Sequence, residues 1–244
     1  NDTATEFTFH LREGMRWSDG VPFTADDILF WYEDILLNQE LNVPVPDWLT
    51  SEGEVAKVEK VNNYTVLFRF AASKGLFLQE LAQPKGSRPT NYPRHYLEQF
   101  HIKYNPDSID KLMKGAGVES WTELFKLKVG RIDTPGEPES FVNTEMPTIN
   151  AWALTQGYTK DAKQVIAERN PYYWKVDVAG NQLPYIDRVV YQVRDNIDEL
   201  VELALNGEIN MQSRHIATLD NKALFEENME KKRAEGRFSD LLQV

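Results

Sequence analysis

Residues 7–33 read FTFHLREGMRWSDGVPFTADDILFWYE, and this stretch indicates the fold class. Phe7, Phe9 and Leu11 alternate with polar residues, which predicts a half-buried strand over Glu6–Arg12. Asp19-Gly20 favours a tight turn. Thr24 is a typical N-cap residue, and the apolar residues after it recur at helical spacing, which predicts a helix over Ala25–Leu37. Strand, turn and amphipathic helix therefore follow one another within 33 residues.

The pattern continues with a hairpin over Val55–Phe70, since two runs rich in β-forming residues flank the pair Asn62-Asn63. A short helix is predicted over Leu76–Leu81. Residues 83–94 contain three prolines and one glycine and are predicted to be a loop, whereas 95–128 are mostly helical. The stretch Gly130–Pro147, rich in proline and glutamate, is the best candidate for a linker.

Beyond this linker the sequence predicts strands at Val165-Ile166 and over Ile186–Val193. Asn170-Pro171 should end a strand, and Gly180-Asn181-Gln182 should form a turn. A helix begins near Asp198 and ends at Asn206-Gly207. The short segment Glu208–Met211 would then complete a βαβ unit with some parallel sheet, and residues 219–235 form a last charged helix. The sequence therefore predicts a mixed α/β protein.

Composition excludes several classes of protein. The 244 residues include 27 basic and 38 acidic side chains, a formal charge of −11 that disfavours binding to nucleic acid. The mean hydropathy is −0.51, and no apolar run reaches the roughly 18 residues of a membrane-spanning helix. Because cysteine is absent, thiol catalysis, disulfides and cysteine–metal sites are excluded.

Motifs of catalysis and cofactor binding are also missing. No nucleophile elbow, zinc-binding HExxH helix or phosphate-binding loop occurs, so we predict no catalytic residue, no cofactor and no metal. His95 and His101 lie six residues apart, which is not a helical metal spacing. The pair Asp26-Asp27 is better explained as charge at a helix N-terminus than as acid–base machinery.

The tryptophans are the remaining candidates for ligand contact. Four of the six lie in patterned segments and are predicted to be buried: Trp17, Trp31, Trp121 and Trp174. Trp48 and Trp152 follow proline-containing loops, where an aromatic ring can offer a flat face to a peptide or a sugar. Packing into the core from a loop is the alternative for both.

Three segments of the chain together resemble the family 5 extracellular solute-binding proteins, the oligopeptide and dipeptide receptors of ABC importers. The first is 7–33, the second is ERNPYYWKVDVAGNQLPYIDRVVY at 168–191, and the third is ALNGEIN at 204–210. Asn210 stands where the family usually has aspartate. The family's glycine is absent before Trp152, whose aromatic ring is retained.

This resemblance implies a partial periplasmic-binding-protein-like fold of type II. Residues 1–140 would be the family's extra middle domain and 141–244 a segment of the first ligand-binding lobe. The chain opens directly into a strand pattern and ends in Leu241-Leu242-Gln243-Val244, so we expect a piece of a larger receptor. Trp152, and secondarily Trp48, would lie near the ligand cleft.

The implied function is capture of peptides or similar oligomeric solutes outside the cytoplasmic membrane and delivery to ABC permease subunits. The location would be periplasmic or extracellular. A lipid anchor could attach the full-length protein to the cell surface. An oligosaccharide receptor of the same family and a carboxylate-dependent hydrolase are the alternatives, and a sensing role is not separable from transport.

Overall fold

The computed structural model describes residues 1–130, 141–212 and 216–234. The chain divides into two compact units, residues 1–191 and 192–244, and each is considered by itself. Residues 131–140 of the predicted linker, residue 235 of the predicted last helix and the C-terminal residues 241–244 lie outside the described residues.

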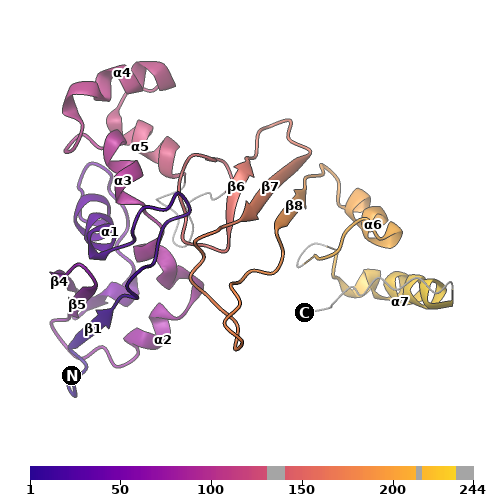
Figure 1. Cartoon of the computed structure of the whole chain (residues 1–244), viewed down its shortest axis with the longest axis horizontal. Coiled ribbons are helices and arrows are strands. Elements are labelled where there is room, and N and C mark those ends of the chain that lie inside the picture. Colours follow the sequence, from indigo (N-terminus) through magenta and orange to yellow (C-terminus); the bar gives the residue numbers. More distant parts are fainter. Residues whose placement is uncertain (131–140, 213–215, 235–244) are drawn as a thin grey trace. The chain divides into compact units, whose positions relative to one another are not determined.

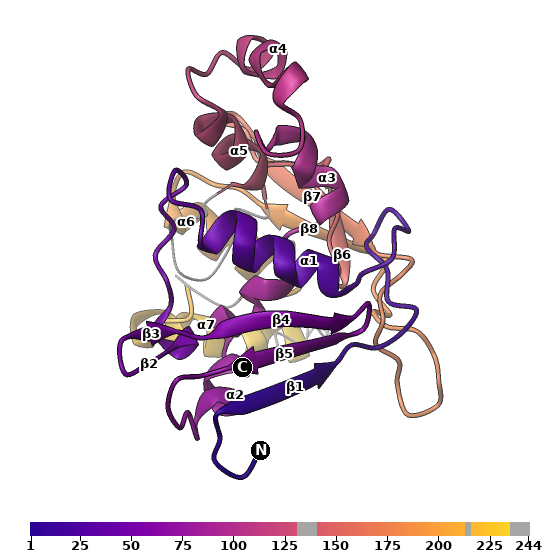
Figure 2. The same ribbon diagram turned by 90° about the vertical axis from the view of Figure 1, so that its left-hand side faces the viewer.

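The predicted opening strand and hairpin form one antiparallel sheet (Figure 2). β1 (Glu6–His10) pairs with β5 (Thr65–Arg69), and β5 pairs with β4 (Lys57–Asn62), which gives the order β1-β5-β4. Phe7 and Phe9 pack against the core, as their alternation predicts. The expectation for this part of the chain is confirmed.

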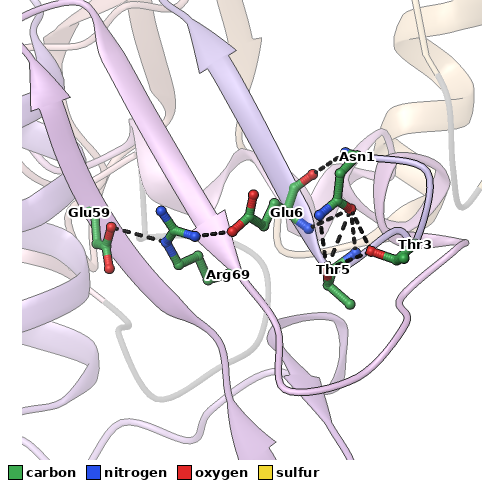
Figure 3. Close-up of polar contacts among 6 residues, drawn as sticks. All are labelled: Asn1, Thr3, Thr5, Glu6, Glu59 and Arg69. Atoms are coloured by element: carbon green, nitrogen blue, oxygen red, sulfur yellow. Dashed lines mark hydrogen bonds and ion pairs between the residues drawn. The ribbon is translucent and has the colours of Figure 1, made fainter.

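The exposed face of the sheet carries a line of charges across its three strands. Arg69 of β5 lies between Glu6 of β1 and Glu59 of β4, and its Nε is 3.2 Å from the Glu59 carboxylate (Figure 3). Next to it, the Asn1 side-chain oxygen accepts the backbone N–H groups of Thr5 and Glu6. Such exposed pairs contribute little stability, but opposite charges across the strands agree with the observed register.

The predicted helix begins at its expected N-cap and changes type along its length. α1 (Ala25–Leu29) continues as a π-helix, η1 (Phe30–Leu36). The Asp27 carboxylate accepts the Thr24 N–H at 2.9 Å, and the Thr24 hydroxyl accepts the Asp26 N–H at 3.3 Å. This capping box fixes the start of the helix. Figure 2 shows α1 running across one face of the β4–β5 pair.

The rest of this part of the chain is helical or built from short strands. The strands β2 (Thr50–Ser51) and β3 (Glu54–Val55) form a separate antiparallel pair. The helical elements are η2 (Asp47–Leu49), α2 (Phe77–Leu81), η3 (Pro84–Thr90), α3 (Arg94–Leu97), η4 (Glu98–Phe100), α4 (Pro106–Ala116) and α5 (Trp121–Val129).

One predicted loop is wrong. Residues 84–90 form the 3₁₀-helix η3 instead. Proline is compatible with the first turn of a helix, and the hydroxyls of Ser87 and Thr90 each donate to the carbonyl three residues earlier. Pro84 therefore begins a short helix here, and Pro89 lies within it.

The core of the first unit is aromatic. Trp17, Trp31 and Trp121 are buried in it, as predicted, and Ile149 belongs to the same cluster. The prediction that Trp174 is buried is wrong, because that residue is only half-buried. Since Ile149 packs against residues that precede the predicted linker, the compact unit continues past residue 140.

The second sheet contains β6 (Trp152–Gln156), β7 (Gln164–Arg169) and β8 (Arg188–Gln192) in that order (Figure 1). β6 and β7 are antiparallel. The predicted strands at Val165-Ile166 and within Ile186–Val193 are confirmed. β7 ends directly before Asn170-Pro171, also as predicted.

Residues 192–244 contain α6 (Ile197–Asn206) and α7 (Leu219–Ala234). Asn228 of α7 donates to the Leu205 carbonyl at 2.9 Å and so connects the two helices. The predicted strand at Glu208–Met211 is wrong. Gly207 adopts a left-handed conformation, and the Glu208 N–H returns to the Leu203 carbonyl, so the backbone closes the helix instead of entering a sheet. The described residues of this unit therefore form no βαβ unit.

Within the described ranges, no helix is both long and apolar enough to cross a bilayer.

Candidate functional site

Trp152 begins β6 and lies directly opposite Arg169 of β7. Its side chain is half-buried. The indole Nε1–H donates to the Ile186 carbonyl at 3.0 Å. Since this bond uses the indole's polar group, a solute meeting Trp152 would contact the ring itself, by stacking or by edge contact.

Asn170 holds the backbone that leads into Trp152. This side chain is fully buried, and its Nδ2 donates to the carbonyls of Asn150 at 3.0 Å and Thr148 at 3.2 Å. Its backbone N–H donates to the Ala151 carbonyl, and its Oδ1 accepts the Tyr172 N–H. A buried amide with these bonds is well satisfied. The sequence predicted only a strand end here.

The turn of the first motif meets the same segment. The Ser18 N–H donates to the Thr148 carbonyl at 2.8 Å, and the Thr148 N–H donates to the Ser18 hydroxyl at 3.1 Å. Gly20 has a φ of +90°, and a Cβ there would lie 3.1 Å from the Tyr172 hydroxyl. The predicted turn at Asp19-Gly20 is confirmed, and it packs against the residues that follow Asn170-Pro171.

The second predicted turn, near Gly180-Asn181-Gln182, is also confirmed. The Asp177 carboxylate accepts the N–H groups of Ala179 and Asn181, and Gly180 has a positive φ. Hydrogen bonds from the Tyr185 hydroxyl and from Asn181 hold the pKa of the Asp177 carboxyl well below its usual range. These groups satisfy one another, as expected of a structural turn.

Trp48 requires a correction. Its side chain is 1% exposed, and its ring stacks on Trp31 with centroids 6.0 Å apart and planes inclined by 12°. Phe77 packs against it from a third element. Because this packing covers the ring, Trp48 has no face free for a solute. The proline-containing loop that suggested exposure leads instead into the buried helix η2.

Trp174 is the aromatic residue that the sequence placed wrongly in the core. Arg12 lies over its ring at 5.4 Å from the centroid, and the Lys175 ammonium lies at 5.1 Å. Such cation–π contacts are typical of partly exposed rings. A neighbouring lysine and a tyrosine-rich context were the available signals that this tryptophan is not a core residue.

The acidic pair Asp26-Asp27 is structural, as the sequence indicated. Asp26 forms a salt bridge with Lys60, while Asp27 is buried and also accepts the Arg94 N–H at 3.1 Å. Burial raises the pKa of the Asp27 carboxyl, and the hydrogen bonds from Thr24 and Arg94 act in the opposite direction. Its acceptor oxygens are occupied by the helix cap and by α3.

A second buried carboxylate, Asp34, connects η1 to the segment after η4. Its oxygens accept hydrogen bonds from the Lys103 ammonium at 2.6 Å and from the Tyr104 hydroxyl at 2.5 Å.

Across the part of the chain that the structure describes, no group of three or more histidine and acidic side chains is placed to hold a metal.

Comparison with known proteins identifies the family. Residues 1–240 match the sequence model of the bacterial extracellular solute-binding proteins, family 5 (its "Middle" region). The chain belongs to this family. Its relatives are named as binding proteins.

Relatives of this family-5 chain differ in the solutes that their names state. The periplasmic alpha-galactoside-binding protein of Rhizobium meliloti (strain 1021) is 30% identical over 214 residues, which are 86% of this chain and 27% of the relative. The periplasmic oligopeptide-binding protein OppA of Salmonella typhimurium is 24% identical over 84% of this chain and 32% of its own length.

Solved structures of binding proteins also match. An oligopeptide-binding protein OppA is 39% identical over 97% of this chain, with a TM-score of 0.81, and the match covers 35% of that protein. MelB from Agrobacterium fabrum C58, solved with stachyose, is 26% identical over 93% of this chain, with a TM-score of 0.62, and the match covers 30% of it. The fold is therefore that of part of a type II periplasmic binding protein. The chain spans about a third of the length of these relatives.

Proposed function

We propose that the protein to which this chain belongs is the substrate-binding component of an ABC importer. It captures an oligomeric solute outside the cytoplasmic membrane and delivers it to the permease subunits. The observation that carries this proposal is the family match over residues 1–240. Because the chain spans about a third of its relatives, capture and delivery are functions of the whole receptor.

The expected division of that receptor belongs to the same proposal. Residues 1–140 form the middle domain and 141–244 a returning segment of the first lobe. A second lobe closes over the solute, and the closed form presents a different surface to the permease. Relatives named as periplasmic support a periplasmic or extracellular location, and a lipid anchor on the full-length protein is a further proposal.

The solute is either a peptide or an oligosaccharide. The OppA structure, at 39% identity, favours a peptide, whereas the alpha-galactoside-binding relative and MelB favour an oligosaccharide. In either case Trp152 supplies the contact, since an indole ring stacks on the apolar face of a sugar or on a planar peptide group. The charge of −11 disfavours nucleic acid as a partner.

Native mass spectrometry of the full-length receptor, purified without refolding, tests the proposal. A heterogeneous set of bound peptides identifies a peptide receptor, and masses spaced by one hexose identify a sugar receptor. Thermal shifts with stachyose and with a panel of short peptides provide the second readout. A receptor that retains neither class, and that none of these compounds stabilises, contradicts the proposal.

Trp152→Ala in the full-length receptor tests the contact residue. We expect the affinity for the retained solute to fall roughly tenfold, the scale of one lost aromatic contact. Trp174→Ala is the matched control, because Trp174 is also half-buried but is engaged by Arg12 and Lys175. Equal affinity in the wild type and Trp152→Ala contradicts the assignment of Trp152.

A further inference from the structure

We propose that Asn170 is a positioning residue for Trp152, and that through Thr148 it connects Trp152 to the turn at Ser18. The proposal rests on the proposed function only in so far as Trp152 contacts the solute. It assigns a specific role to two sequence motifs, 17–20 and 170–174, which otherwise read as turns and packing residues.

The first step is the number of hydrogen bonds that one residue, through its side chain and its backbone N–H, makes to one segment. The Asn170 Nδ2 group donates to Thr148 and Asn150, and the Asn170 backbone donates to Ala151. Three of the four residues directly before Trp152 are thus held by a single buried residue. Trp152 itself pairs with Arg169 of β7. β7 and the residue directly after it, Asn170, therefore hold both Trp152 and the segment that leads into it.

The second step is the connection to the first motif. The Thr148 carbonyl accepts from both the Asn170 amide and the Ser18 backbone, and the Thr148 N–H returns to the Ser18 hydroxyl. The Tyr172 ring lies against Gly20, where a Cβ would approach the hydroxyl to 3.1 Å. Thr148 is therefore the point at which the two motifs meet.

The third step is that asparagine is the side chain required at position 170. Its amide nitrogen meets two carbonyl oxygens, while its amide oxygen accepts the Tyr172 N–H at 2.9 Å. Aspartate has nearly the same shape but would face the two carbonyls with an acceptor instead of a donor. An ionised aspartate would repel the two carbonyl oxygens, and a protonated one could donate to only one of them, so either form loosens the segment that the asparagine holds.

The test is fluorine NMR of this chain labelled with 5-fluorotryptophan. The six tryptophans give one resonance each, and Trp152→Phe assigns the signal of Trp152. We expect Asn170→Asp to shift or broaden the Trp152 resonance, while the signals of the buried Trp31 and Trp48, which stack on each other in the core, stay in place. A merely structural role would move all of these resonances together.

Asn143→Asp is the matched control. The Asn143 amide also donates to two oxygens, those of Lys128 and Tyr96, and its oxygen also accepts an N–H two residues later. It forms no bond with residues 148–152, so the Trp152 resonance should not move. If Asn170→Asp does not fold, Asn170→Ala removes the same donors without a buried charge.

A Trp152 resonance that is unchanged in a folded Asn170 variant overturns the proposal. The second measurement uses stachyose and tetra-alanine with the full-length receptor. Asn170→Ala should weaken whichever probe binds by about the same factor as Trp152→Ala, on the order of tenfold. If neither probe binds although the resonance moves, the positioning role is supported, and the native mass spectrometry of the full-length receptor decides the proposed function separately.

Discussion

At the scale of single residues, His101 has the clearest pH response. It is 2% exposed, its Nε2 lies 3.1 Å from the Asp34 carbonyl, and its Nδ1 accepts the Lys103 N–H at 3.2 Å. These partners assign the neutral imidazole with its proton on Nε2. A second proton on Nδ1 would point at a donor. Burial lowers the pKa of His101, although the Asp34 carbonyl acts in the opposite direction.

The direction of the pH effect follows. The pKa of His101 in the folded state lies below its ordinary value of 6.5. The stability that neutral His101 contributes to the folded state is therefore complete above pH 6.5, and it is lost as the pH falls through the folded-state pKa. We expect His101→Gln, which is neutral throughout, to flatten the decline in the free energy of unfolding between about pH 7.5 and about pH 5. Urea unfolding at the two pH values measures it.

His10→Gln is the control for this experiment, since it removes an exposed histidine from β1. The His101→Gln and wild-type free energies of unfolding should converge as the pH falls. Parallel curves across the whole range would show that His101 does not contribute to the acid sensitivity.

At the scale of elements, the start of α1 depends on Thr24. Its hydroxyl accepts the Asp26 N–H, and its backbone donates to Asp27. We expect Thr24→Ala to reduce the free energy of unfolding by about 0.5–2 kcal/mol, the usual cost of a lost N-cap. Thr24→Ser retains the hydroxyl and should cost less. Equal losses in both variants, measured by urea unfolding, would assign the effect to the methyl group instead of the cap.

The end of α6 gives a second prediction for an element. Gly207 has a φ of 78°, so an alanine there is strained by about 1–2 kcal/mol. Since α6 belongs to the unit 192–244, Gly207→Ala should accelerate hydrogen exchange in α6 and leave α4 unchanged. Gly117→Ala, at the left-handed end of α4, should do the reverse. Faster hydrogen exchange in both α4 and α6 in either variant would show that the two units do not open independently of each other.

Local patterns predicted the elements well where one face of the chain decides the structure. The alternation of Phe7 and Phe9, the Asn62-Asn63 connection and the Asn206-Gly207 stop each specify an element without help from distant residues. They were insufficient where a local pattern suits two structures. Pro84 suits a loop or the first turn of a helix, and the apolar residues after Gly207 suit a strand only if a neighbouring strand pairs with them.

The candidate site was harder to predict than the elements because it is built by contacts between distant segments. Trp152 and Trp48 have similar proline-containing approaches in the sequence, and only packing separates them: Trp31 covers Trp48, whereas Trp152 stays half-buried. The importance of Asn170 depends on carbonyls some 20 residues earlier, and Thr148 depends on Ser18, 130 residues away. No local pattern contains these pairings.

At the scale of the whole molecule, the last prediction concerns solute binding by these 244 residues alone. A closing receptor binds its solute with two walls, and exclusion of water strengthens each polar contact. The chain spans about a third of its relatives, so we expect it to supply only part of those contacts. The solute would still lose its translational and rotational freedom, at a cost of roughly 4–15 kcal/mol.

Most of the measurable affinity should therefore disappear. We expect calorimetry of this chain against stachyose, tetra-alanine and any solute retained by the full-length receptor to show no tight binding, whereas the full-length receptor binds its own solute. The accompanying control is urea unfolding of the chain with and without solute. A cooperative transition that is the same in both shows that the chain is folded in the calorimetry experiment. Submicromolar binding by the 244 residues would place the whole site within them, and Trp152 would then be one contact of a complete site rather than part of one wall.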